Sequence, residues 1–189
     1  MAKNTKIIIS ERRNMNTASL LFGKSSFSNE FRSKNTNQKC LSRNCKTCEI
    51  MDLEEKIHIN KYKINLDFRL NCNTVNTIYL YVCKHCTGKE GFYIGKTTMP
   101  CNRRANGHRA CFSLMQDKND KLNREKYKLS ALSYHIYDKH NKYFEDGLKN
   151  FKMGIIKQTS PQNLEKLEDL YIRNTKADIC GLNRYKVMQ

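Results

Sequence analysis

Cysteines and histidines recur in this chain at spacings that suit a metal ion. Cys83 and Cys86 form a C-x-x-C pair, and His135 and His140 follow as an H-x4-H pair. Thiolate and imidazole are the ligands that zinc takes in structural sites, where four protein ligands leave no open position. The set therefore predicts a structural zinc ion that joins a strand hairpin to a later helix. Ordinary surface histidines beside free thiols are the alternative.

A second group of cysteines lies earlier in the chain. Cys40, Cys45 and Cys48 are spaced C-x4-C-x2-C, and Cys72 follows just before an apolar segment. Four thiolates complete a tetrahedral zinc site. His58 lies inside the wide gap before Cys72 and is an alternative fourth ligand. Free thiols beside a linker remain the other interpretation.

The stretch that follows Cys72 and contains Cys83 and Cys86 predicts a β-hairpin followed by a helix. Residues 78–83 and 91–95 are short runs of β-branched and aromatic residues, joined by a glycine-containing turn. Pro100 then marks a helix start. On that helix, Arg104 and His108 lie one turn apart and share a face.

The motifs in this part of the chain resemble those of the GIY-YIG nuclease family, in the family's order. They are N-T-I-Y at 76–79, F-Y-I-G at 92–95, R-x-x-x-H at 104–108, L-E-D-L-Y-I at 167–172 and G-L-N at 181–183. Thr77 stands where the family has a backbone glycine. The C-x-x-C between the tyrosine motifs, the earlier cysteines and the N-x-I-Y variant resemble most closely the endonuclease part of Penelope-like retroelements.

The resemblance implies a catalytic set and a catalytic cation. Glu168 would bind Mg²⁺ or Mn²⁺, a hard cation that takes carboxylate oxygens, and Glu165 one turn earlier is the competitor. Arg104 would hold the scissile phosphate through its planar donor fork, with Arg103 as the adjacent alternative. The full set is Tyr79, Tyr93, Arg104, His108, Glu168 and Asn183.

The remaining roles are also implied by the resemblance. Tyr79 is the candidate base for the attacking water, and Tyr93 orients water or phosphate. A free phenol titrates near pH 10, so the base role needs cationic help. His108 shares the base role or binds phosphate, and Asn183 supports the site by hydrogen bonding. Tyr81, on the same face as Tyr79, is expected to pack in the core.

The implied activity is hydrolysis of a DNA phosphodiester bond that leaves a 3′-hydroxyl and a 5′-phosphate. In a retroelement the 3′-hydroxyl would prime reverse transcription, with a reverse transcriptase attached in cis or supplied in trans. The location would be intracellular and nuclear. Lys96, Arg103 and Arg109 are predicted to contact DNA.

Composition agrees with a nucleic-acid partner. The 189 residues carry a net charge of +17, and such an excess favours phosphate-rich partners through counterion release. Neither a signal-peptide pattern nor an apolar run long enough to span a bilayer is found, so we expect no membrane partner and a reducing compartment. In such a compartment we expect the cysteines to be metal ligands or free thiols and not disulfides.

We expect three parts in the chain. Residues 1–39 form a basic arm with a possible strand at 7–9, residues 40–75 form a cysteine-rich linker, and residues 76–189 form the nuclease-like domain. The predicted fold class is α+β, with a small three-stranded antiparallel or mixed sheet flanked by helices. The other expected elements are a hairpin within 57–70, a helix at 127–138, a strand at 151–156 and a helix capped by Ser160 and Pro161.

Two other classes of function fit the same residues. One is a zinc-stabilised nucleic-acid-binding module that has lost catalysis. The other is a scaffold protein that uses zinc clusters for protein contacts. Only the first shares with a nuclease the steep salt dependence of binding to DNA.

Overall fold

The computed structural model describes residues 39–40, 42–86, 90–115, 130–140 and 147–184, without the side chains of residues 114, 115 and 184. The strand predicted at 7–9 lies outside these residues. Within the described part of the chain, no helix has the length and apolar character needed to cross a membrane.

A three-stranded antiparallel sheet with the strand order β4-β3-β5 lies at the centre of the fold. Its central strand is rich in β-branched and aromatic residues, which suit a strand that pairs on both sides. The predicted α+β class is therefore confirmed, and the sheet is antiparallel throughout. The strands are β3 (Thr77–Cys83), β4 (Phe92–Thr97) and β5 (Phe151–Gln158).

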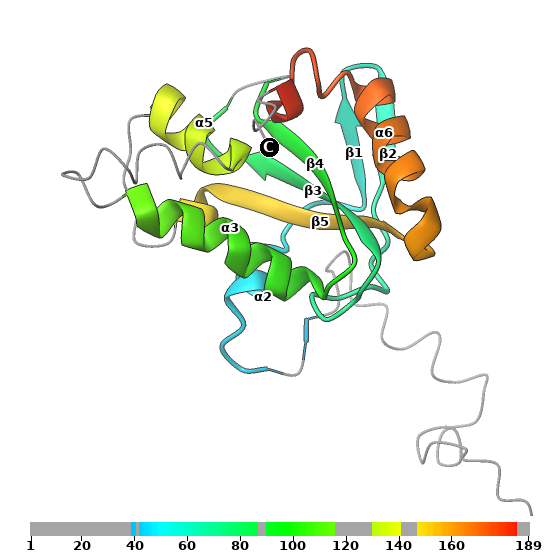
Figure 1. The fold of residues 1–189 in the computed structure, drawn as a ribbon, viewed down its shortest axis with the longest axis horizontal. Helices are drawn as coiled ribbons and strands as arrows, with labels where there is room; N and C mark the ends of the chain where they lie inside the picture. Colours follow the sequence, from blue (N-terminus) through cyan, green and yellow to red (C-terminus); the bar gives the residue numbers. More distant parts are fainter. Residues whose placement is uncertain (1–38, 41, 87–89, 116–129, 141–146, 185–189) are drawn as a thin grey trace, which may run out of the picture. The chain divides into compact units, whose positions relative to one another are not determined.

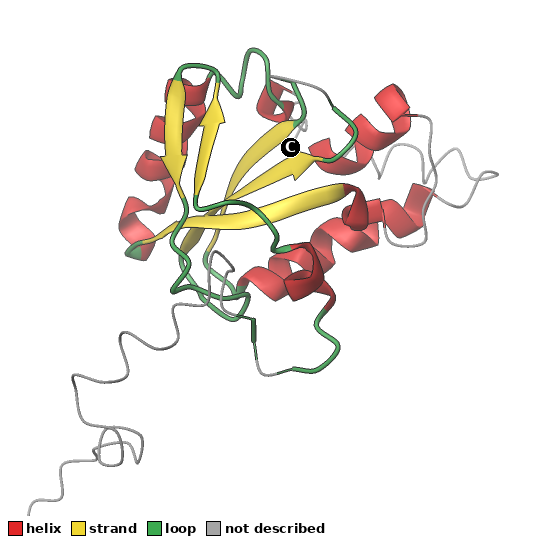
Figure 2. Cartoon of the chain, turned by 180° about the vertical axis from the view of Figure 1, so that it is seen from behind, coloured by secondary structure: helices red, strands yellow, loops and turns green. Residues whose placement is uncertain are grey.

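The two faces of the sheet bury different side chains, because successive residues of a strand point to opposite sides. Tyr79, Tyr81 and Cys83 belong to one buried cluster, and Ile78 and Leu80 belong to the other. Figures 1 and 2 show helices on both sides of the sheet. The first face packs against α3 (Cys101–Met115), α5 (Ala131–His140) and the 3₁₀ turn η1 (Gly147–Asn150); the second packs against α6 (Leu164–Thr175).

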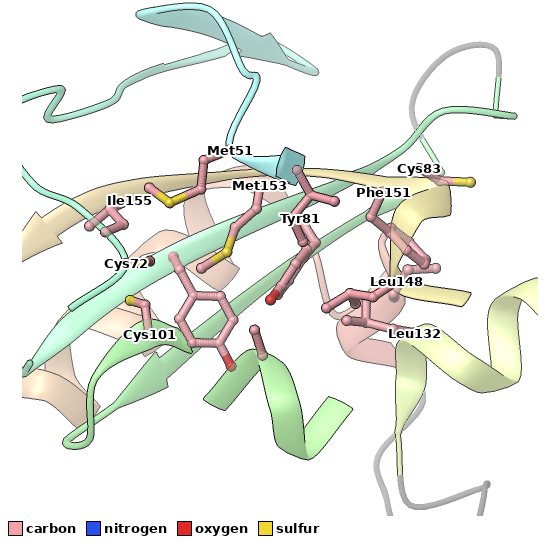
Figure 3. Close-up of a cluster of buried hydrophobic side chains, with 14 of the residues drawn as sticks. Met51, Cys72, Tyr81, Cys83, Cys101, Leu132, Leu148, Phe151, Met153 and Ile155 are labelled. Atoms are coloured by element: carbon pink, nitrogen blue, oxygen red, sulfur yellow. The ribbon is translucent and has the colours of Figure 1, made fainter. Parts of the chain in front are cut away.

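The core on the first face includes Tyr81, which is fully buried as expected for a packing residue. Figure 3 shows it beside Phe151 and Met153 of β5, with Leu132 and Leu148 nearby. The rings of Tyr81 and Phe151 meet edge to face with centroids 6.2 Å apart. This arrangement is a favourable geometry for aromatic pairs, so the core fixes β3 and β5 beneath α3 and α5.

The hairpin predicted within 57–70 is confirmed as β1 (Lys56–Ile59) and β2 (Tyr62–Asn65), which follow a short helix α2 (Lys46–Ile50). Asn60 turns the hairpin in the left-handed conformation, at φ 56°. Its Nδ2 donates to the carbonyl of Thr175 at 2.6 Å, at the end of α6. This hydrogen bond therefore joins the β1–β2 hairpin to α6, the helix that carries Glu168. Figure 1 shows the hairpin and α6 side by side.

Two helix starts differ from the sequence-based expectation. The helix predicted at 127–138 is described from Ala131 to His140, and residues 127–129 lie outside the described part. Ser160 precedes a 3₁₀ turn, η2 (Pro161–Asn163), and its side chain makes no capping hydrogen bond. Pro161 occupies the first position of this turn, where its missing N–H costs nothing.

Candidate functional site

Tyr79 lies at the centre of a polar cluster on the first face of the sheet. The Nε of Arg104 donates a hydrogen bond to the Tyr79 hydroxyl at 3.1 Å. The Nε2 of His108 lies 3.3 Å from the same hydroxyl. Arg104 and His108 come from α3, where their four-residue spacing places both above β3. The structure thus brings together three of the residues that the sequence singled out.

Burial makes the Tyr79 phenol a weaker acid than a free phenol. The side chain is fully buried, and this burial raises the pKa of the phenol well above its usual value. A negative charge on Tyr93 would raise it further, whereas Arg104 acts to lower it. At neutral pH, Tyr79 is therefore a neutral phenol in the absence of substrate.

His108 is a neutral side chain in this setting. Burial, followed by the positive charge of Arg104, lowers its pKa to about 3. Its Nδ1 lies 3.3 Å from the hydroxyl of Ser130, a buried residue directly before α5. A neutral imidazole cannot attract a phosphate as a cation would, so His108 offers one N–H donor and one acceptor nitrogen to its neighbours.

Tyr93 is the more accessible of the two phenols. It is only partly buried, on the edge strand β4, and its ring centroid lies 6.4 Å from that of Tyr79. Burial raises its pKa, Arg104 opposes this effect, and the carboxylate of Glu168 adds to it. Tyr93 therefore feels the charges of both Arg104 on α3 and Glu168 on α6.

The two glutamates of α6 differ sharply in exposure. The side chain of Glu168 is 17% exposed and that of Glu165 is 79% exposed. The Nζ of Lys96 lies 3.2 Å from Glu168 and 3.6 Å from Glu165. Burial raises the pKa of Glu168, and the Lys96 ammonium opposes this rise. Glu168 is thus the carboxylate held against β4, and a carboxylate of this kind suits Mg²⁺ or Mn²⁺.

Asn183 binds the free edge of β4. Its Oδ1 accepts a hydrogen bond from the backbone N–H of Ile94 at 2.9 Å, and its Nδ2 donates to the Ile94 carbonyl at 2.7 Å. The amide therefore pairs with the edge strand as a neighbouring strand would. This contact holds the backbone next to Tyr93 and leaves the Asn183 amide engaged.

The basic residues predicted to bind DNA lie in different surroundings. Arg103 is exposed, whereas its neighbour Arg104 is partly buried and bonded to Tyr79. Arg109 donates from Nη1 to the hydroxyl of Thr47 at 3.2 Å and to the Oδ1 of Asn106 at 3.0 Å. Arg109 thus joins α3 to α2, the helix inside the cysteine-rich segment.

The mixed cysteine and histidine group converges as predicted. Cys83, Cys86, His135 and His140 each offer a ligand atom, all within 4.8 Å of one another. The Nε2 atoms of the two histidines lie 3.2 Å apart, and the Cys86 sulfur lies 3.2 and 3.4 Å from them. Bonds of about 2.0–2.3 Å to one tetrahedral zinc give separations of about 3.3–3.8 Å. These four side chains can hold zinc structurally. His85 instead lies with its Nε2 2.7 Å from Asn150 Oδ1.

The four earlier cysteines also converge, and Cys72 rather than His58 completes the group. Sulfur–sulfur distances of 3.5 Å join Cys45 to Cys72, Cys48 to Cys40 and Cys48 to Cys72. These distances are far longer than the ~2.05 Å of a disulfide and close to those in a tetrahedral zinc site.

Among the four earlier cysteines are thiols whose pKa values differ with their surroundings. Burial raises the pKa of Cys48 to about 11 and that of Cys72 well above its usual value. Burial also acts to raise the pKa of Cys45, but hydrogen bonds from the backbone N–H of Cys48 and from neighbouring thiols lower it to about 7. Burial thus keeps Cys48 and Cys72 protonated without a metal, and four thiolates side by side would need a cation such as zinc to offset their charge.

The group of four earlier cysteines contacts the start of α3 through Cys72. The backbone carbonyl of Cys72 accepts a hydrogen bond from the N–H of Asn102 at 2.8 Å. The Nδ2 of Asn102 donates to the Oδ1 of Asn73 at 2.9 Å. Because α3 carries Arg104, a zinc ion on Cys72 would also fix the helix that presents the guanidinium.

Sequence reasoning missed one residue and one ion pair of the site. The partner role of Ser130 was invisible, because a serine before an apolar stripe signals only a helix cap. The ion pair between Lys96 and Glu168 joins positions 72 residues apart and has no local signal. Comparison of the chain with protein-family models, with curated proteins and with solved structures finds no match.

Proposed function

We propose that the chain is a metal-dependent DNA endonuclease of the GIY-YIG type, which hydrolyses a phosphodiester bond to a 3′-hydroxyl and a 5′-phosphate. The observation that carries this proposal is the cluster of two phenols, a guanidinium and an imidazole: Tyr79, Tyr93, Arg104 and His108. One half-buried carboxylate, Glu168, is held at β4 by Lys96, and its charge acts on Tyr93. Charge stabilisation by groups fixed in advance is the main source of catalysis for such reactions.

Each group has a role that its surroundings support. Arg104, fixed by Tyr79, would hold the scissile phosphate. Glu168 would hold Mg²⁺ or Mn²⁺, which lowers the pKa of bound water and neutralises developing charge when present. Tyr93, which solvent reaches, would orient water or phosphate. For Tyr79 to act as the base, the substrate and the cation must offset the burial that raises its pKa.

The two zinc groups would have a structural role. Four protein ligands fill each tetrahedron, so neither ion would have an open position for substrate. The setting in a Penelope-like retroelement, with a nick that primes a reverse transcriptase in the nucleus, is supported by the N-T-I-Y variant and the cysteine spacing.

A zinc-stabilised nucleic-acid-binding module is the second candidate. It is favoured by two observations: Lys96 already pairs with Glu168, and Tyr79 is fully buried. An inactive module would keep the steep salt dependence of DNA binding that a net charge of +17 implies.

Nicking of supercoiled plasmid separates the two candidates. We expect open-circular product with Mg²⁺ or Mn²⁺ and none with excess EDTA added briefly, before structural zinc is lost. A DNA polymerase should extend the nick directly, because the proposed product carries a 3′-hydroxyl. Tight DNA binding without any nicking in either metal would favour the inactive module.

A further inference from the structure

His108 is held between two hydroxyl groups. Its Nδ1 lies 3.3 Å from Ser130 Oγ, and its Nε2 lies 3.3 Å from the Tyr79 hydroxyl. Ser130 is 3% exposed, His108 is 6% exposed and Tyr79 is fully buried, so bulk water does not compete for these bonds. The position of one imidazole proton therefore decides the direction of both bonds.

Two arrangements satisfy a neutral imidazole, which has one N–H donor and one acceptor nitrogen. In the first, Nδ1–H donates to Ser130 and Nε2 accepts from Tyr79. In the second, Ser130 donates to Nδ1 and Nε2–H donates to Tyr79. Arg104 already donates to the Tyr79 oxygen at 3.1 Å. A donor on its oxygen makes the phenol a stronger donor and a weaker acceptor, which favours the first arrangement.

The start of α5 fixes the position of Ser130. Its carbonyl accepts the backbone N–H of Tyr134 and the hydroxyl of Ser133, both at 3.0 Å. The same helix carries His135 and His140 of the mixed zinc group. The residue directly before this helix, Ser130, is thus presented to α3.

We propose that Ser130 is a positioning residue that fixes His108 in the Nδ1–H tautomer. The Nε2 atom then accepts the Tyr79 hydrogen bond, and the phenol oxygen is held toward Arg104. The effect on cleavage rests on the proposed nuclease function, whereas the tautomer itself does not.

Nitrogen NMR of histidine side chains tests the tautomer, because protonated and unprotonated ring nitrogens give separate signals. His108→Gln identifies the His108 signals. We expect a protonated Nδ1 and an unprotonated Nε2 in the zinc-loaded protein. Ser130→Ala should give a mixture of tautomers, and Ser130→Thr, which keeps the hydroxyl, should preserve the original one. Ser113→Ala, an exposed serine on α3, is the control and should change nothing.

A wild-type His108 protonated at Nε2 would overturn the proposal, even if Ser130→Ala failed to fold. Unchanged signals in a folded Ser130→Ala variant would overturn it as well.

Plasmid nicking tests the consequence for cleavage. Loss of a neutral hydrogen bond worth about 1 kcal/mol predicts that Ser130→Ala nicks roughly five- to tenfold more slowly, with Ser130→Thr within about twofold of wild type. Wild-type nicking by Ser130→Ala would reject the positioning role. If the wild type did not nick at all, the nuclease proposal would fail while the tautomer result stood.

Discussion

The ring of Tyr79 lies directly over the Cα of Gly95, its cross-strand partner. A Cβ atom at Gly95 would come within 2.6 Å of both Cζ and Oη of Tyr79. Glycine at this position of β4 therefore makes room for the phenol that Arg104 and His108 hold. The third residue of the Y-I-G motif thus has a steric role in this chain.

A methyl group at this position should push the phenol away from its partners. We expect Gly95→Ala to destabilise the fold by about 1–3 kcal/mol, the usual cost of overpacking. The nicking rate of the protein that remains folded should fall as well, because the phenol is displaced. Urea unfolding and plasmid nicking measure the two effects. Gly107→Ala is the matched control, since nothing lies within 4 Å of a Cβ in that position on α3. It should stabilise the helix by up to about 1 kcal/mol. Equal effects of the two substitutions would contradict the steric role.

The burial of neutral His108 predicts a pH dependence of stability. Its pKa is about 3 in the folded chain, below the value of about 6.5 in an unfolded one. The unfolded state therefore binds the extra proton between these values, and stability falls as pH drops through this window. The slope attributable to His108 should approach about 1.4 kcal/mol per pH unit.

His108→Gln should have a shallower slope than wild type between about pH 6 and pH 5 in urea unfolding. The comparison cancels the titration of the zinc ligands, which both proteins share. Parallel slopes would show that the imidazole is not buried in its neutral form.

Removal of the proposed zinc ions should weaken the fold. Elemental analysis should give two zinc ions per chain, with one lost in Cys83→Ser and one lost in Cys48→Ser. Loss of a structural metal is expected to cost roughly 3–5 kcal/mol, or about 10 °C in Tm for a chain of this size. Cys111→Ser is the control, because Cys111 belongs to neither group. A wild-type protein without zinc, or equal metal content in all variants, would refute both sites.

The adjacent arginines should separate binding from cleavage. Arg103 is exposed, so Arg103→Ala should weaken DNA binding and lower the salt slope by about 1, with little change in nicking at saturating DNA. Arg104→Ala should lose nicking by at least about 100-fold, since it removes a charge that is fixed by Tyr79. Filter binding at several salt concentrations, combined with nicking at saturation, checks this. The reverse pattern would assign the phosphate contact to Arg103.

Local patterns predicted the sheet and most helices correctly. Runs of β-branched and aromatic residues marked the central strands, alternation marked the β1–β2 hairpin, and the spacing of Arg104 and His108 placed them on one face of α3. Cysteine and histidine spacing marked both groups that could hold a metal, because short C-x-x-C loops bring two sulfurs to one ion. These features depend on residues that are close in the sequence.

The missed features depend on contacts between distant segments. Ser130 meets His108 only because α5 begins beside α3, and Lys96 meets Glu168 only because α6 packs along β4. The full burial of Tyr79 likewise arises from Gly95, Arg104 and α3 together. No window of the sequence contains these pairs, so only the fold reveals them.

The paired substitutions Glu168→Gln and Glu165→Gln test the central claim most directly. Both residues contact Lys96 from the same helix, but only Glu168 is largely buried, and only its charge acts on the pKa of Tyr93. We predict that Glu168→Gln abolishes Mg²⁺-dependent plasmid nicking, while Glu165→Gln nicks at close to the wild-type rate. Equal nicking by the two variants would contradict the proposed nuclease site.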